Sequence, residues 1–115
     1  MRKGPQRISQ DYNDTKLEKG MIITNEPGIY KEGKHGIKTE NVLVVVEDEK
    51  TEFGQFMRFQ VISYCPIDLD GIDVDMLNIK EKMWLNEYHK EVYKLLSAYL
   101  NEEEREWLKI KTREI

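Results

Sequence analysis

Asn25-Glu26-Pro27-Gly28 and Lys38-Thr39-Glu40-Asn41 are the two stretches that decide the fold. Each borders an apolar run of strand composition, Met21 to Glu26 for the first and Ile37 to Val46 for the second. The residue before a proline is restricted to extended geometry, so Glu26 is expected to end its strand. Pro-Gly suits the central positions of a type II turn, and the Gly- and Lys-rich stretch from Ile29 to Gly36 is expected to be a loop.

Antiparallel pairing of these two strands would bring the two glutamates together. If Glu26 lies opposite Glu40, then Thr24 faces Val42, and both carboxylates lie on one face with Cβ atoms about 5 Å apart. Like charges at that distance destabilise a sheet unless a cation, or a pair of cations, cancels them. Carboxylate oxygens suit Mn, Mg or Ca, and Zn or Co when an imidazole joins them. In the alternative register one glutamate points to solvent, and the pattern alone leaves both registers open.

The rest of the chain changes from strand to helical periodicity. Asp48-Glu49-Lys50 is expected to be a turn, and Phe56 to Tyr64 a third strand. Asn78 and Asn101 each stand three residues before a glutamate, the capping-box pattern that begins a helix. The first of the two helices carries an apolar stripe that we expect to be buried. The stripe consists of Trp84, Tyr88, Val92, Leu95 and Tyr99, and is widened by Leu85 and Leu96.

Composition excludes several classes of function. The 115 residues are 39% apolar and 35% charged, with a net charge of −4 and both signs interspersed. No basic stripe marks a nucleic-acid surface. The longest aliphatic run, Val42 to Val46, is far shorter than the ~20 residues of a membrane span. We therefore expect neither a nucleic-acid partner nor membrane association.

Cysteine content and the N-terminal residues indicate a cytoplasmic protein. Cys65 is the single cysteine, which excludes an internal disulfide and fits a reducing compartment. Its position at the end of an apolar run favours packing over a reactive thiol. The basic residues at the start are not followed by an apolar stretch, so no signal peptide is expected there.

Motifs along almost the whole chain carry a family resemblance. They are Gly4-Pro5-Gln6-Arg7-Ile8-Ser9, Leu17 to Tyr30, Gly36-Ile37-Lys38-Thr39-Glu40-Asn41, Tyr64-Cys65-Pro66-Ile67-Asp68, Trp84 to His89 and Glu102 to Leu108. Together they resemble the closing part of Xaa-Pro aminopeptidases, with the last three similar to the C-terminal extension of that branch. These enzymes belong to the pita-bread metallopeptidase superfamily, with methionine aminopeptidase, prolidase and creatinase.

The resemblance implies a dinuclear metal centre, most commonly manganese, with zinc or cobalt as alternatives. Its ligands in the family are two aspartates, one histidine and two glutamates, and the glutamates correspond to Glu26 and Glu40. The Glu40 position bridges both ions. The Glu26 position ligates one ion and helps to handle the proton of the attacking water, which makes Glu26 the catalytic candidate. The implied substrate is a proline-containing peptide, cut between its N-terminal residue and the following proline.

Several family features are changed or lacking in this chain. The aspartates and the ligand histidine lie further upstream in the family than this sequence reaches. Arg2 and Lys3 stand where the family usually has a histidine and an acidic residue, and Lys38 replaces an arginine. His35 and His89 match no family ligand and are expected to be surface or packing residues.

The sequence therefore predicts an α+β chain. Residues 1–70 are expected to form the strand-rich distal half of a pita-bread catalytic domain, and residues 71–115 a helical C-terminal extension. With the other ligands absent, we expect weak or no metal binding and no peptidase activity from this chain alone. The alternative is a non-catalytic interaction module that retains the fold.

Apolar strand residues left without the other half of the domain predict association with another chain. The partner is expected to be a second copy, forming a homo-oligomer, or a complementing N-terminal half. The residues expected to be exposed on the strands are Ile22, Ile23, Val42 and Val44.

Overall fold

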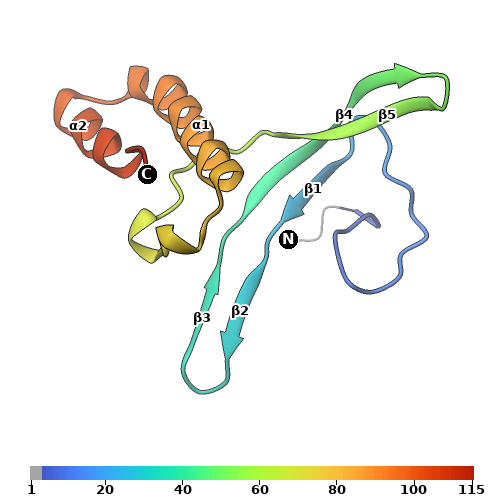
Figure 1. The fold of residues 1–115 in the computed structure, drawn as a ribbon, viewed down its shortest axis with the longest axis horizontal. Coiled ribbons are helices and arrows are strands. Elements are labelled where there is room, and N and C mark those ends of the chain that lie inside the picture. The colour runs from blue at the N-terminus through green and yellow to red at the C-terminus, as the bar shows by residue number, and fades with distance from the viewer. Residues whose placement is uncertain (1–3) are drawn as a thin grey trace. The chain divides into compact units, whose positions relative to one another are not determined.

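The computed structural model describes residues 4–115, which divide into two compact units between Ser63 and Tyr64. The first unit is built of antiparallel strands and the second of helices, in the order that the sequence predicts (Figure 1). Arg2 and Lys3, the departures noted at the N-terminus, lie outside the described residues.

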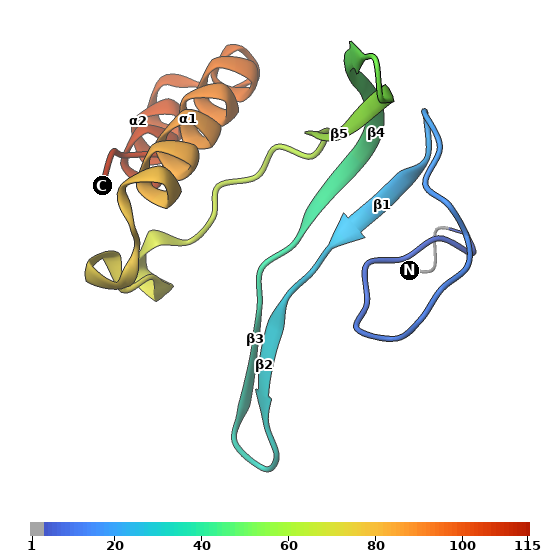
Figure 2. The ribbon, with the colours of Figure 1, turned by 45° about the vertical axis from the view of Figure 1, so that its right-hand side comes forward.

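The strand-rich unit contains a sheet and a narrower ribbon. Strands β1 (Ile22–Asn25), β4 (Asn41–Thr51) and β5 (Gly54–Val61) form an antiparallel sheet in the order β1-β4-β5. Strands β2 (Gly28–Lys31) and β3 (His35–Lys38) pair with each other as a two-stranded antiparallel ribbon. Figure 2 shows that β2 prolongs the line of β1 and that β3 leads into β4.

One register runs through both pairs of strands. Asn25 lies opposite Asn41 at the end of the sheet pairing, and Gly28 lies opposite Lys38 at the start of the ribbon. Between these two pairs the ladder is broken, because a proline has no N–H to donate. The Thr39 N–H donates to the Pro27 carbonyl oxygen at 3.2 Å and holds the two chains together at the break.

The ribbon replaces two expected features, the type II turn and the loop. A type II turn requires a positive φ at its third residue, and Gly28 lacks one because it opens β2 instead. The stretch from Ile29 to Gly36 is strand on both sides of a short connection. Gly33 at φ +67° allows that connection to reverse the chain, and the Lys34 N–H closes it on the Lys31 carbonyl at 3.0 Å.

The turn expected at Asp48-Glu49-Lys50 is also misplaced. β4 runs through these residues, and the chain reverses between Thr51 and Gly54, which pair with each other. Gly54 has φ +124°, a conformation that favours glycine. The register shifts between Glu47 and Lys50, so the polar run forms an irregularity within the strand rather than its end.

Burial in the sheet follows the alternation of side chains along the strands. Ile23, Leu43 and Val45 are buried, whereas Ile22 on the opposite face is 41% exposed. The prediction that Ile23 would face water is therefore wrong. Val42 and Val44 are of intermediate exposure.

The helical unit contains two α-helices with matching caps. Short 3₁₀ turns, Leu69–Gly71 and Val74–Met76, precede α1 (Ile79–Leu96), and another, Ser97–Tyr99, leads to α2 (Glu102–Lys111). Both predicted capping boxes are present, with Asn78 and Asn101 as the N-cap residues. No helix within residues 4–115 is long and apolar enough to cross a membrane.

The buried face of α1 differs from the predicted apolar stripe. Tyr88 and Val92 are buried as expected, but Trp84 is 50% and Tyr99 86% exposed. Leu85, which widens the predicted stripe, is buried as well, whereas the buried His89 is not part of that stripe, and Leu95 is 38% exposed. The error arises because a stripe counted from the aromatic residues is rotated from the one that packs. Trp84 still contributes by stacking on the Tyr88 ring, with centroids 5.5 Å apart.

His89 is fully buried and connects α1 to the segment before it. Its Nε2 atom accepts a hydrogen bond from the Ile67 N–H at 3.0 Å. An accepting nitrogen carries no proton, so the neutral ring has its hydrogen on Nδ1. Burial lowers the pKa of His89 from its ordinary value, and the positive charge of Arg113 acts in the same direction.

We expect the helical unit to lose stability as the pH falls from 7 to 5. The pKa of His89 is lower in the folded state, so the unfolded chain binds more protons in this range. Full stability is present above the ordinary histidine pKa and is lost as the pH falls through that value toward the folded pKa. Thermal unfolding at several pH values, with His89→Gln as the control, measures this effect. An equal loss of stability in His89→Gln would assign the pH dependence to other groups.

Candidate metal centre

Glu26 and Glu40 lie at the break between the sheet and the ribbon. Glu26 follows β1 and Glu40 precedes β4, and the register on both sides of the break places one opposite the other. Thr24 pairs with Val42, as expected for the register in which Glu26 lies opposite Glu40. Of the two registers that the sequence left open, the structure therefore has the one that brings the glutamates together.

Lys38 joins the two carboxylates. Its Nζ atom donates to Oε2 of Glu26 at 3.1 Å and to Oε2 of Glu40 at 2.9 Å. Lys38 ends β3 two residues before Glu40, and strand alternation directs such residues to the same side. The other oxygen of Glu26, Oε1, accepts a hydrogen bond from the Thr24 hydroxyl at 2.8 Å.

These contacts favour the charged forms of Glu26 and Lys38. The Thr24 hydroxyl, and then the Lys38 ammonium, lower the pKa of Glu26. The Glu40 carboxylate, and then that of Glu26, raise the pKa of Lys38. All three charged side chains are between 38% and 44% exposed, so solvent screens the attraction.

The arrangement fits a cation but cannot complete a metal site. Two carboxylates that share one ammonium group present hard oxygen donors at one place, the chemistry that divalent cations require. Within residues 4–115, no group of three or more His, Cys, Asp or Glu side chains could hold a metal ion. Glu26 and Glu40 could therefore supply part of a coordination shell.

Sequence reasoning missed the contacts of Lys38 and Thr24 with the glutamates. From the sequence, Lys38 is only a replacement for the arginine of the family, and its contact with both carboxylates is not predicted. The signal was available in the alternation of the strands, because Lys38 and Glu40 are two residues apart, as are Thr24 and Glu26.

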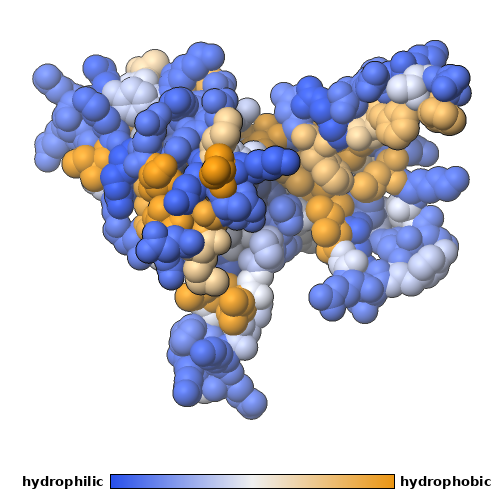
Figure 3. Space-filling view, viewed as in Figure 1, coloured by the Kyte–Doolittle hydropathy of each residue, from blue (hydrophilic) through white to orange (hydrophobic). Residues whose placement is uncertain are grey.

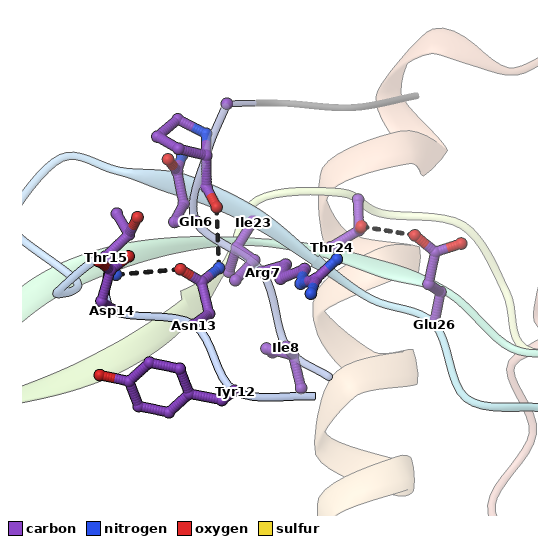
Figure 4. Close-up of a pocket in the computed structure, with 12 residues that line it drawn as sticks. Gln6, Arg7, Ile8, Tyr12, Asn13, Asp14, Thr15, Ile23, Thr24 and Glu26 are labelled. Carbon is purple, nitrogen blue, oxygen red and sulfur yellow. Dashed lines mark hydrogen bonds between the residues drawn. The ribbon is translucent and has the colours of Figure 1, made fainter. Parts of the chain in front are cut away.

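A hollow of about 900 Å³ lies beside Glu26 in the strand-rich unit. Residues 4–8 and 12–15 line it together with Ile23 and Thr24 of β1. Figure 4 shows the hydrogen bonds by which Asn13 connects two parts of the segment before β1. Its side chain donates to the Pro5 carbonyl at 2.9 Å and accepts from the Thr15 N–H at 3.0 Å.

In the described part of the chain, no hydrogen bond or ion pair joins either histidine or the cysteine to the two glutamates. His35 is exposed at the start of β3, and His89 is a buried packing residue of the helical unit. Cys65 is exposed, so the prediction that it packs in the core is wrong. The backbone of Cys65 is nevertheless engaged, because its N–H and carbonyl both bond to the Tyr88 hydroxyl, at 3.1 and 2.7 Å.

The chain belongs to the M24 family of metallopeptidases. Residues 55–115 match the family described as the C-terminal region of peptidase M24, and residues 1–47 match metallopeptidase family M24 itself. The resemblance seen in the sequence is thereby confirmed, and the chain corresponds to the C-terminal part of the pita-bread domain.

Relatives of known name within this family are aminopeptidases P. A probable Xaa-Pro aminopeptidase P from Coprinopsis cinerea is 40% identical over 97% of this chain. Aminopeptidase P1 from Arabidopsis thaliana is 37% identical over 97% of it. The chain spans only 19% and 18% of these two relatives.

A solved structure shares the fold. The X-prolyl aminopeptidase of Caenorhabditis elegans, described as a cytosolic enzyme with a di-nuclear active site, matches with a TM-score of 0.76 at 30% identity. The match covers 86% of this chain and 17% of that enzyme. The predicted fold class, antiparallel strands of a pita-bread domain followed by two C-terminal helices, is therefore confirmed.

Proposed function

We propose that this chain contributes Glu26 and Glu40 to the dinuclear metal centre of an Xaa-Pro aminopeptidase, and that catalysis requires further polypeptide. The observation that carries the proposal is the meeting of the two carboxylates at the break in the ladder, around one shared cationic group. The relatives support the activity, because they are Xaa-Pro aminopeptidases and a related enzyme has a di-nuclear site.

Each glutamate has a separate role in this proposal. Glu40 would bridge two divalent ions, with manganese preferred and zinc or cobalt as alternatives, and Glu26 would ligate one of them. The bound ions would supply a water of lowered pKa and polarise the scissile carbonyl. Glu26 would also accept the proton of that water, and the Thr24 hydroxyl fixes the orientation of its carboxylate through Oε1.

The substrate is a peptide with proline in its second position, cut before the proline. The hollow beside Glu26 supports this assignment, because it is open and of a size that suits a short peptide. The setting we propose for the reaction is the cytosol, as in the related enzyme from Caenorhabditis elegans.

The further metal ligands would come from a polypeptide that corresponds to the part of the relatives not matched by this chain. The ribbon offers a surface that such a polypeptide could cover. Its apolar side chains Ile29, Tyr30 and Ile37 are between 64% and 70% exposed. Figure 3 shows apolar side chains on this ribbon and hydrophilic ones at its tip. A second copy of the chain is the other candidate to cover this surface.

Manganese binding tests the proposal directly. We expect the isolated chain to bind Mn²⁺ weakly, with a dissociation constant well above micromolar, because affinity rises with the number of preorganised ligands. Glu40→Gln and Glu26→Gln should each weaken this binding further, and Glu32→Gln, an exposed glutamate outside the ribbon's strands, serves as the control. The free Mn²⁺ signal in electron paramagnetic resonance measures the bound fraction.

A peptidase assay completes the test. The chain alone should not hydrolyse an Xaa-Pro peptide in the presence of Mn²⁺, because most of the coordination shell is absent. Hydrolysis abolished by Glu40→Gln would show that the site is complete without other polypeptide. Mn²⁺ binding that is unaffected by both glutamate substitutions would instead favour a non-catalytic interaction module.

A further inference from the structure

We infer that Lys38 is a built-in counter-cation, which pairs with Glu26 and Glu40 when no metal is bound, offsets one of their two negative charges, and leaves them when divalent ions bind. The inference rests on the proposed metal site. It adds a residue that competes with the metal for the same two carboxylates, so that metal binding is coupled to movement of the Lys38 side chain.

The contacts show that the lysine occupies the place of a ligated cation. One ammonium group takes Oε2 from each glutamate, at 3.1 and 2.9 Å. The second oxygen of Glu26 is already engaged by Thr24. A metal ion that takes the same pair of Oε2 atoms must therefore displace Nζ from its position.

An ammonium group cannot remain there once a metal is bound. It has three N–H donors and no lone pair, so it cannot serve as a ligand, and it would stand next to a doubly charged ion. Lys38 can move at little cost, because its flexible side chain is 39% exposed and water can solvate the released ammonium.

The opposite role for Lys38 predicts the opposite result. If the lysine mainly positioned the carboxylates for the metal, its removal would weaken metal binding. If it competes, its removal leaves two carboxylates facing each other without a counter-charge, and a metal ion then binds more tightly. The sign of the change therefore distinguishes competition from positioning.

Titration of the whole chain with Mn²⁺ alone measures that sign. We expect Lys38→Met, which keeps the length of the side chain, to bind Mn²⁺ about three- to tenfold more tightly, the effect of losing two exposed ion pairs. The matched control is Lys19→Met, which removes an ion pair of similar length, 3.0 Å to Glu47, on another part of the same unit. This control should bind Mn²⁺ as the unsubstituted chain does.

A second measurement needs no metal. In the presence of a chelator, Lys38→Met should lower the melting temperature. This loss should become smaller when Glu40→Gln is added, because the repulsion between carboxylates is then removed and only the ion pair with Glu26 is lost. Equal losses with and without Glu40→Gln would overturn the counter-cation role.

The outcomes separate this inference from the proposed function. If Glu40→Gln weakens Mn²⁺ binding but Lys38→Met leaves it unchanged or weaker, the counter-cation inference fails and the metal site stands. If neither Glu26→Gln nor Glu40→Gln affects Mn²⁺ binding, the proposed site fails, and the inference fails with it.

Discussion

Leu108→Ala is expected to lower the free energy of unfolding of the helical unit by about 2–5 kcal/mol. Leu108 lies on α2 with only 2% of its surface exposed and is among the largest fully buried side chains. Truncation removes its transfer free energy and leaves a cavity that neighbouring side chains fill only in part. Chemical denaturation followed by tryptophan fluorescence measures the loss.

Ile110→Ala is the matched control on the same helix. Ile110 is 59% exposed, so its truncation should change the free energy of unfolding by no more than about 0.5 kcal/mol. Equal effects of the two substitutions would mean that α2 does not bury the face that contains Leu108.

Tyr88→Phe is expected to destabilise the helical unit by about 1–3 kcal/mol. The substitution keeps the aromatic ring and its stacking on Trp84 but removes the hydroxyl, which both accepts from the Cys65 N–H and donates to its carbonyl. Two backbone groups then lose a partner at once. Burial raises the pKa of Tyr88, so the hydroxyl stays protonated and able to donate throughout the neutral range.

The control for the lost hydroxyl is Tyr99→Phe. Tyr99 is 86% exposed, and its hydroxyl is free to bond to water in either state, so the melting temperature should not change. A Tyr88→Phe variant as stable as the unsubstituted chain would show that water replaces both bonds to Cys65.

Local chemistry made part of this fold predictable from sequence. The pairing of Thr24 with Val42 is one of the two registers that the adjacent strand patterns allow, and the caps at Asn78 and Asn101 follow from side chains that bond to their own helix. In each case the residues that specify the feature are close in sequence. The prediction then requires no knowledge of what the segment packs against.

Features that depend on context were predicted less well. The ribbon strands consist entirely of exposed residues, so no burial pattern marks them, and their Gly and Lys content favours a loop. Which face of α1 is buried depends on what packs against it, and the aromatic residues alone pointed to Trp84 and Tyr99. Predicting the contact of Lys38 with Glu26 requires the registers of β1 with β4 and of β2 with β3.

The broken ladder also bears on how the candidate site assembles during folding. Glu26 and Glu40 are brought together by a single hairpin, closed at its tip near Gly33, with the same register before and after the break. Hairpins of this kind form in about 1–10 μs, and closure of a short loop costs little chain entropy. The two carboxylates therefore meet through contacts local in sequence, and their encounter with Lys38 does not wait for the helices to fold. The strand-rich unit would therefore hold the two carboxylates, already paired with one ammonium group, before the helices fold.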